Sequence, residues 1–409
     1  MTIPVAVRTL LNRPLLGRQS VVLVAVLLII CEFIVVYGFA PGRLKGAGVQ
    51  PDSVSYVCYG LSLGEASSSK ALELSGKLFD QFGALGLQVS DCSSFSFIST
   101  LYPRLLLPGL IAGVSHLGIP QALVLPSILI YMAFASLWLW IVLAGLRTIS
   151  VRIWLRALAP LAAFTLVLPL VAVLTEGPLV LAFVAAVAVL AGWTKLRKRW
   201  RLIVILVLGG VMLITRQSWP IVGPLWGAAL IPVLAPVVVR NPHLKAKAAG
   251  LVAVSVVVST TVAGLINWTL TSFTLPDGTS PDYYAREGEL FDFVSIAILA
   301  INSTADDFSS ALHRGDLLSI AVFLWSLAGL VVLTHHRAWL VLMAVAPTWV
   351  FGAYQTGLVV LDQGTVAVGT NYRYYLPAIF GTLAAGWIIS DRKMPSQTGD
   401  TQSPNYSHS

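Results

Sequence analysis

Long apolar runs, almost free of charge, constrain this chain more than any other feature of its sequence. Each run holds about 20 residues, the length with which an α-helix crosses the hydrocarbon core of a bilayer. Ten such runs lie near residues 20–39, 121–145, 155–175, 178–193, 202–215, 221–239, 249–268, 317–334, 338–361 and 374–390. Only 11% of the 409 residues are charged, compared with about 25% in soluble domains. The sequence therefore predicts an all-α polytopic membrane protein with about 10–11 transmembrane helices, and it excludes a soluble enzyme.

Two of the apolar segments leave the number of membrane crossings open. An eleventh segment, 101–118, is shorter and is interrupted by Pro103, Pro108 and Gly109, so we interpret it as a half-span or re-entrant helix. The first run, 20–39, follows three arginines and resembles a signal peptide. It is longer than the apolar core of such peptides, which holds roughly 7–15 residues. We therefore interpret it as a retained anchor.

The basic and acidic residues fall in different loops. The basic loops hold 17 of the 26 Lys and Arg residues, and they are the N-terminus, 146–156, 194–201, 240–247, Arg337 and the pair Arg392 and Lys393. The remaining loops hold 15 of the 18 acidic residues. Because basic loops stay cytoplasmic, both termini are predicted inside and the acidic loops outside. We attribute the net charge of +8 to the basic loops on the cytoplasmic side of a cell inner membrane. We therefore expect no nucleic-acid partner.

The chain is predicted to form a single transmembrane domain over residues 1–393. Residues 394–409 are rich in Ser, Gln and Asn, which predicts a disordered cytoplasmic tail. Two outer segments, 40–100 and 269–316, are too long to be simple connectors between helices.

These outer segments contain a predicted amphipathic helix, two cysteines and an apolar stretch. An apolar face at helical spacing predicts an amphipathic helix over Ser69–Phe82 that lies on the outer membrane surface. Cys58 and Cys92 form a disulfide outside the cytoplasm in one interpretation, and in the other they are unpaired small apolar residues. The apolar stretch Leu290–Ala300 of the second segment is suited to dock on the bilayer.

The candidate functional residues are charges at helix ends on the predicted outer side. Asp52 follows the first run, Glu176 interrupts a long apolar passage, Arg216 ends one run and Arg373 opens the last. An ionised side chain at membrane depth costs on the order of 2.5–3.5 kcal/mol, so it usually faces a polar cavity. Each residue also has a plainer interpretation. Asp52 is then a loop carboxylate, Glu176 and Arg216 an ion pair between helices, and Arg373 an interfacial anchor.

The order and sidedness of these residues resemble the membrane glycosyltransferases of the GT-C architecture. Within this architecture the chain most resembles mannosyltransferases. Enzymes of this type use polyprenyl-phosphate sugars as donors. The matching positions are Asp52 with Tyr56, Tyr102-Pro103-Arg104, Glu176, Thr215-Arg216 and Arg373-Tyr374. Many relatives carry two adjacent acids in the first outer loop, whereas Ser53 follows Asp52 here. A divalent metal is therefore possible but not required, and no metal ligand is assigned.

The resemblance implies an inverting sugar transfer on the outer face of the membrane. A polyprenyl-phosphate sugar is the donor, an envelope glycolipid or glycan is the acceptor, and membrane lipids surround the site. The implied roles are catalytic base for Asp52, donor-phosphate binding for Arg216 and Arg373, orientation of the sugar or of an arginine for Glu176, and substrate contacts for Tyr56, Tyr102, Arg104 and Tyr374. The alternative is a lipid-linked sugar flippase or transporter, which favours charges near the bilayer midplane and an internal repeat. A non-enzymatic partner in envelope assembly is the third interpretation.

Overall fold

The structure is a computed structural model that describes part of the chain as helices packed against one another. It describes residues 14–16, 27, 51–63, 70–71, 73–74, 105–115, 124–144, 149–150, 176–192, 196–216, 218–239, 248–274, 293–313, 317–363 and 374–392. Its helices are α3 (Pro51–Leu63), α6 (Leu106–Ser115), α7 (Val124–Ala144), α9 (Glu176–Leu190), α10 (Lys198–Thr215), α11 (Trp219–Val239), α12 (Ala248–Thr274), α15 (Phe293–His313), α16 (Leu317–His335), α17 (Trp339–Gln363) and α18 (Leu376–Arg392). The prediction of a helical chain is confirmed for these residues.

Most of the predicted apolar runs coincide with a helix. Eight of the ten are covered by α7, α9, α10, α11, α12, α16, α17 and α18, whereas 20–39 and 155–175 lie outside the described residues except for Leu27. The interrupted segment 101–118 contains the short helix α6. Its proline, Pro108, lies in the first turn, where a missing backbone N–H leaves no helical hydrogen bond unmade.

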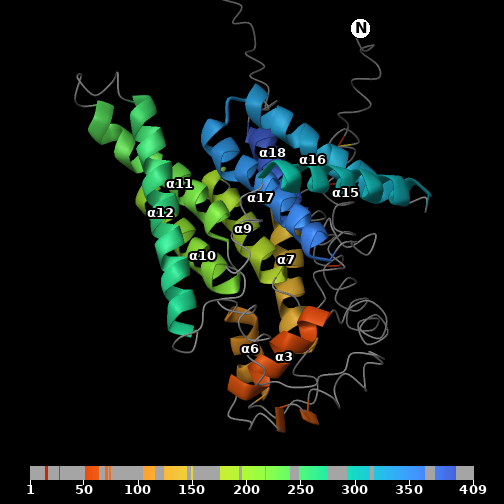
Figure 1. Cartoon of the computed structure of the whole chain (residues 1–409). Coiled ribbons are helices and arrows are strands. Elements are labelled where there is room, and N and C mark those ends of the chain that lie inside the picture. The colour runs from red at the N-terminus through yellow and green to blue at the C-terminus, as the bar shows by residue number, and fades with distance from the viewer. Residues whose placement is uncertain are drawn as a thin grey trace, which may run out of the picture.

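One helix in the described part of the chain is long and apolar enough to cross a membrane. It is the part of α12 from Gly250 to Leu270, and several shorter apolar helices accompany it. α12 packs mainly on α11 and lies along the edge of the bundle (Figure 1). The contact between α11 and α12 is close, because a Cβ added at Gly223 or Gly227 would meet the backbone of the facing helix at Thr260 or Val256.

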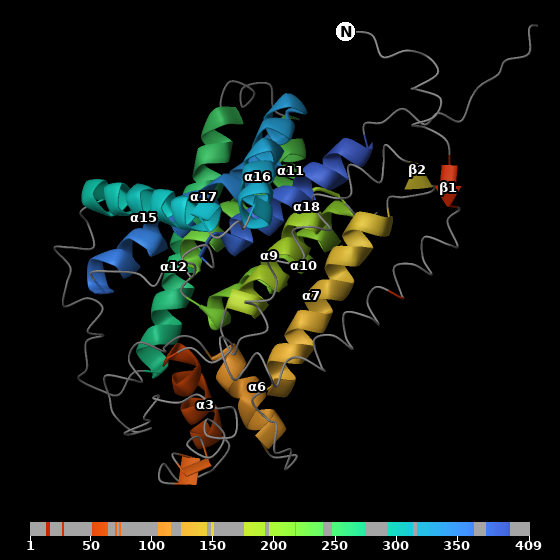
Figure 2. The same cartoon turned by 90° about the vertical axis from the view of Figure 1, so that its right-hand side faces the viewer.

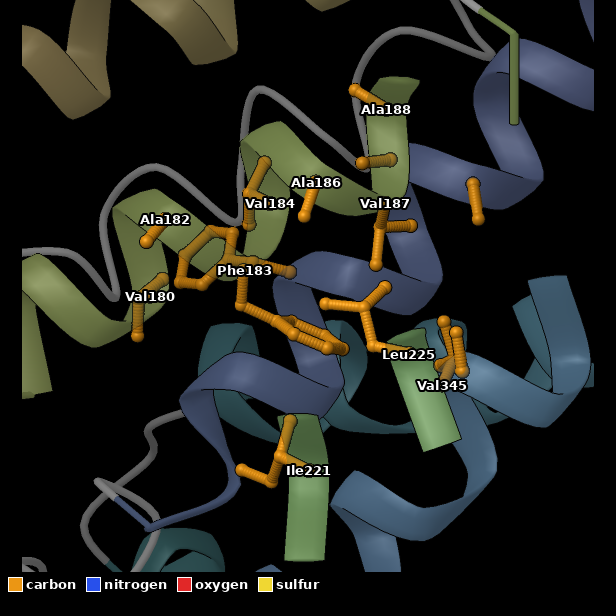
Figure 3. Close-up of a cluster of buried hydrophobic side chains, with 14 of the residues drawn as sticks. Val180, Ala182, Phe183, Val184, Ala186, Val187, Ala188, Ile221, Leu225 and Val345 are labelled. Atoms are coloured by element: carbon orange, nitrogen blue, oxygen red, sulfur yellow. The ribbon is translucent and has the colours of Figure 1, made fainter. Parts of the chain in front are cut away.

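The core of the bundle is built around α9. Nearly every residue from Gly177 to Val189 is buried, and α9 contacts α7, α10, α17 and α18. Figure 3 shows its small side chains and Phe183 beside Ile221 and Leu225 of α11 and Val345 of α17. Alanine and valine allow neighbouring backbones to approach closely, and Gly381 of α18 makes room for the Phe183 ring.

Helices α3 and α6 lie together at the lower end of the described helices in both views (Figures 1 and 2). They pack through Gly60, where a Cβ would lie 2.7 Å from Ile111 Cβ and 2.9 Å from the Pro108 carbonyl oxygen. The two long segments predicted to lie outside contain helices, since 40–100 contains α3 and 269–316 contains α15 together with the end of α12. Pro51 begins α3, where its fixed φ suits the first helical turn.

Two smaller expectations can be compared with the described residues. Cys58 is buried and disulfide-bonded, and its partner lies outside the described residues. Within the predicted helix 69–82, the four described residues are helical, with Ala71 buried and Lys70 and Glu73 exposed. The described residues also include an antiparallel pairing of β1 (Pro14–Leu16) with β2 (Ile149–Ser150). Both strands come from segments that the charge pattern predicts to be cytoplasmic.

Candidate functional site

Arg216 stands at the point where α10 ends and the chain turns into α11. Its backbone is extended (φ −161°, ψ 164°), and its N–H donates to the Met212 carbonyl. Ser218 then begins the next helix, because its carbonyl accepts the N–H groups of Ile221 and Val222, both at 2.9 Å. A cation at the carboxyl end of a helix is stabilised by the helix dipole. The local sequence therefore favours an arginine here even before any ligand is considered.

The side chain of Arg216 is only 6% exposed and contacts α17 and the segment directly before α18. Its Nη2 donates to Gln355 Oε1 of α17 at 3.4 Å. Its guanidinium carbon lies 5.2 Å from the ring centroid of Tyr374, directly before α18. The Gln355 amide and the Tyr374 ring are neutral groups, and both contacts orient the guanidinium. We call Arg216, Gln355 and Tyr374 the Arg216 cluster.

Helix α17 holds this cluster together through residues within two turns. The residues directly before α18 pack closely on Gly352, since a Cβ there would lie 3.0 Å from the Tyr374 carbonyl oxygen and 2.9 Å from Tyr375 Cδ1. Gln355 follows three positions later on the same face and contacts Arg216. Gly357 makes room for the backbone of Ile296 in α15. One stretch of α17 thus positions the end of α10, the start of α18 and the helix α15.

The start of α6 joins the same end of α10. The Leu105 N–H donates to the Ile214 carbonyl at 2.8 Å, two residues before Arg216. Leu105 directly follows the Tyr102-Pro103-Arg104 motif in sequence. Because α3 packs on α6, Tyr56 belongs to the helix pair next to this end of α10, and its side chain is 1% exposed.

Glu176 begins α9, which packs on the next helix in the chain, α10, as an antiparallel hairpin. In such a hairpin the start of the first helix and the end of the second lie on the same side. Glu176 therefore belongs to the end of the hairpin that carries Arg216. An acidic residue at a helix start is stabilised by the helix dipole.

The structure brings together some of the predicted residues and leaves others undescribed. Arg216 and Tyr374 are in contact. The backbones of Asp52 and Glu176 belong to the first turns of α3 and α9, whereas their side chains, like all of Tyr102, Arg104 and Arg373, lie outside the described residues. The roles assigned to all these residues stay predictions.

Gln355 is the member of the cluster that the sequence did not indicate. It lies 139 residues from Arg216 in the chain, inside a predicted span where a single glutamine carries no motif. A polar side chain in an apolar helix was the one available signal, because such residues usually face the interior of a bundle. Among the described residues, no group of three or more His, Cys, Asp or Glu lies close enough together to hold a metal ion.

Comparisons of the chain with models of protein families, with curated proteins and with solved structures found no match. The described fold therefore stands as a helical bundle with a buried arginine between helix ends. Any assignment of function depends on the motif residues and on the contacts described above.

Proposed function

We propose that this protein is a multispanning membrane glycosyltransferase of the GT-C type. It transfers a sugar from a polyprenyl-phosphate donor to an envelope glycolipid or glycan on the outer face of the membrane. The observation that carries the proposal is a continuous series of contacts between motif-bearing elements. Helix α3 packs on α6, the start of α6 bonds the end of α10, and Arg216 at that end contacts Tyr374.

The proposed reaction needs a base and a site for the departing phosphate. The Asp52 carboxylate takes the proton of the acceptor hydroxyl, whose oxygen attacks the anomeric carbon opposite the donor phosphate. The bond between the anomeric carbon and the phosphate oxygen breaks, and its electron pair leaves with the lipid phosphate. Inversion at the anomeric carbon follows from this single displacement.

Arg216 supports the phosphate-binding half of this mechanism. A guanidinium binds phosphate oxygens through two parallel N–H bonds, and a buried one is already desolvated and oriented. Gln355 and Tyr374 fix its direction. Arg373 directly precedes Tyr374 in the chain, and it supplies the second cation of the proposal. Glu176, Tyr56, Tyr102 and Arg104 keep the supporting roles that the resemblance implies.

Exposed apolar side chains support the membrane setting. On α12, Val257 and Trp268 are each 63% exposed. A contiguous apolar face of this kind marks an interaction with lipid or with another apolar surface. A lipid-linked donor also gives a physical reason for a site at the ends of membrane helices, where the phosphate lies at headgroup level while its chain remains in the bilayer.

The test is sugar transfer by purified protein in detergent, with a panel of radiolabelled polyprenyl-phosphate sugars. Wild type is compared with Asp52→Asn and with Asp306→Asn, a matched loss of an exposed carboxylate on α15. We expect transfer by wild type and by Asp306→Asn, and at least a 100-fold loss in a folded Asp52→Asn variant. Undiminished transfer in Asp52→Asn would assign the base to Glu176 or another acid. No transfer of any donor, despite a monodisperse preparation and several acceptor extracts, would favour the flippase.

A further inference from the structure

Tyr375 lies next to the Arg216 cluster, and its contacts all lead away from Arg216 toward α15, α16 and α17. We propose that Tyr375 is a positioning residue that holds Tyr374 against Arg216 by anchoring the start of α18 to α15. The effect of Tyr375 on donor binding rests on the function proposed above. The effect of Tyr375 on the Arg216 side chain does not rest on that function. The positioning role and the proposed function can therefore be tested separately.

The anchor is a hydrogen bond between two hydroxyl groups. The Tyr375 hydroxyl lies 3.3 Å from Thr304 Oγ1 of α15. The Thr304 hydroxyl itself donates to the Ala300 carbonyl of its own helix at 2.7 Å. Because the single Thr304 proton is used in that bond, Tyr375 donates and Thr304 accepts. The direction of the bond is thus fixed by the helix, and the phenol has a defined partner.

The Tyr375 ring is also enclosed on its faces and edges. It is 7% exposed, and its centroid lies 6.0 Å from that of Phe323 in α16 and 6.0 Å from that of Trp349 in α17. Phe323 in turn contacts Phe308 of α15 at 5.0 Å. Three helices therefore fix the ring plane, while the hydroxyl fixes its far end.

The position of Tyr375 determines that of its neighbour Tyr374. The two residues form a short turn of 3₁₀-helix immediately before α18, so a shift of one backbone unit moves the other. Gly352 of α17 lies against both, and it leaves no free space for a side chain between them. Tyr374 then presents its ring to the Arg216 guanidinium at 5.2 Å. Release of the Tyr375 hydroxyl should therefore loosen the contact between Tyr374 and Arg216.

The direct test measures how fast the arginine-specific reagent phenylglyoxal modifies Arg216, followed residue by residue with mass spectrometry in detergent. Arg216 is 6% exposed, so it should react slowly in wild type. Arg199, exposed on the same helix, serves as the internal reference. One neutral hydrogen bond corresponds to about a two- to ten-fold change in an equilibrium. We expect Tyr375→Phe and Thr304→Val each to accelerate modification of Arg216 by that factor.

The double variant and a matched control separate positioning from general loosening. Tyr375→Phe combined with Thr304→Val should react no faster than either single variant, because both remove the same bond. Trp226→Phe removes a buried hydrogen bond of an aromatic residue that does not contact Tyr375, from Trp226 Nε1 to the Ile205 carbonyl at 3.3 Å. It should leave the reactivity of Arg216 unchanged. Equal acceleration by Trp226→Phe, or none in Tyr375→Phe and Thr304→Val, would overturn the proposal.

A second measurement connects the positioning to the proposed function. Polyprenyl phosphate should bind wild type and should bind Tyr375→Phe about two- to ten-fold more weakly. If wild type binds no polyprenyl phosphate while Arg216 reactivity still responds as expected, the proposed function fails and the positioning role stands. If wild type binds and Tyr375→Phe binds equally well with unchanged Arg216 reactivity, the positioning role fails and the proposed function stands.

Discussion

Helices α9 and α12 are both rich in apolar residues, but their surroundings are opposite. In α9, Phe183, Val184 and Val187 are completely buried, and protein covers the helix on nearly every side. Among the described helices, α12 packs mainly on α11 and also on α10, and Val257 is 63% exposed. Figure 1 shows α9 within the bundle and α12 at its edge.

The contrast teaches that apolar composition alone does not distinguish a helix buried by other helices from a helix that faces lipid. A helix that is apolar all round needs an apolar environment all round. Neighbouring helices provide it for α9, where alanine and valine permit close packing. For α12 the remaining sides need another apolar phase, because exposed apolar area costs about 25 cal/mol per Å² in water. We interpret that phase as the bilayer of the proposed function.

A charge placed in the middle of α9 should break the protein side of this comparison and have the largest effect. Val184→Lys buries an ammonium with no room for water, and we expect a loss of stability on the order of 5 kcal/mol, enough to prevent folding. The measurement is the yield of monodisperse protein in detergent, with Val184→Ala as a control of the same site. A folded Val184→Lys protein of normal yield would contradict the packing of α9.

The same charge on the exposed face of α12 tests the lipid side. Val257→Lys should make insertion of the 248–274 segment into microsomal membranes less favourable by about 2.5–3.5 kcal/mol. In an aqueous setting, an exposed substitution of this kind changes stability by roughly 0.5 kcal/mol or less. Val257→Leu is the apolar control. Equal insertion of the lysine and leucine variants would contradict a lipid-facing α12.

Two adjacent glycines of α10 sharpen the comparison within one helix. The Trp226 indole lies directly on Gly209, whereas a Cβ added at Gly210 meets nothing within 4 Å. We expect Gly209→Ala to lower stability by about 1–3 kcal/mol through overpacking, seen as a lower midpoint of thermal unfolding in detergent. Gly210→Ala should leave the midpoint unchanged or raise it, because alanine favours helix. A larger loss of stability in Gly210→Ala than in Gly209→Ala would contradict the packing of Trp226 on Gly209.

The smallest effect concerns two tryptophans in unlike surroundings. Trp226 is 7% exposed and its Nε1 donates to the Ile205 carbonyl at 3.3 Å, whereas Trp140 of α7 is 58% exposed. Trp226→Phe removes a long hydrogen bond and should cost about 1 kcal/mol. Trp140→Phe should cost about 0.5 kcal/mol or less. The measurement is the midpoint of thermal unfolding of both variants in detergent. A larger loss of stability in Trp140→Phe than in Trp226→Phe would contradict the burial of Trp226.

Much of the helical framework could be predicted from the sequence, because long apolar runs in this chain have few alternatives to helix. The residues of α3 escaped prediction, since its apolar positions Tyr56, Val57 and Leu61 are mixed with serines and glycine and form no long run. The strand pair of Pro14–Leu16 with Ile149–Ser150 was also missed. Its partners are far apart in the chain, and neither strand is long enough to show a pattern.

The candidate site could be predicted only in part. A charge at the end of an apolar run indicated Arg216, and the resemblance indicated Tyr374 through the pair Arg373-Tyr374. Their contact depends on α17, where Gly352 and Gln355 supply space and a hydrogen bond. Such complementarity between distant segments leaves no periodic signal in one sequence. The same holds for the bond between Tyr375 and Thr304, which joins residues 71 positions apart.

The central claim is that Arg216 holds the phosphate of a polyprenyl-linked donor. Polyprenyl phosphate is common to all such donors, so its binding tests the claim without knowledge of the sugar or the acceptor. The measurement is its affinity for purified wild type, Arg216→Gln and Arg199→Gln, the last an exposed arginine at the other end of α10. The account predicts binding by wild type and Arg199→Gln and at least a tenfold loss in folded Arg216→Gln. Equal binding by all three proteins, or none by wild type, would contradict it.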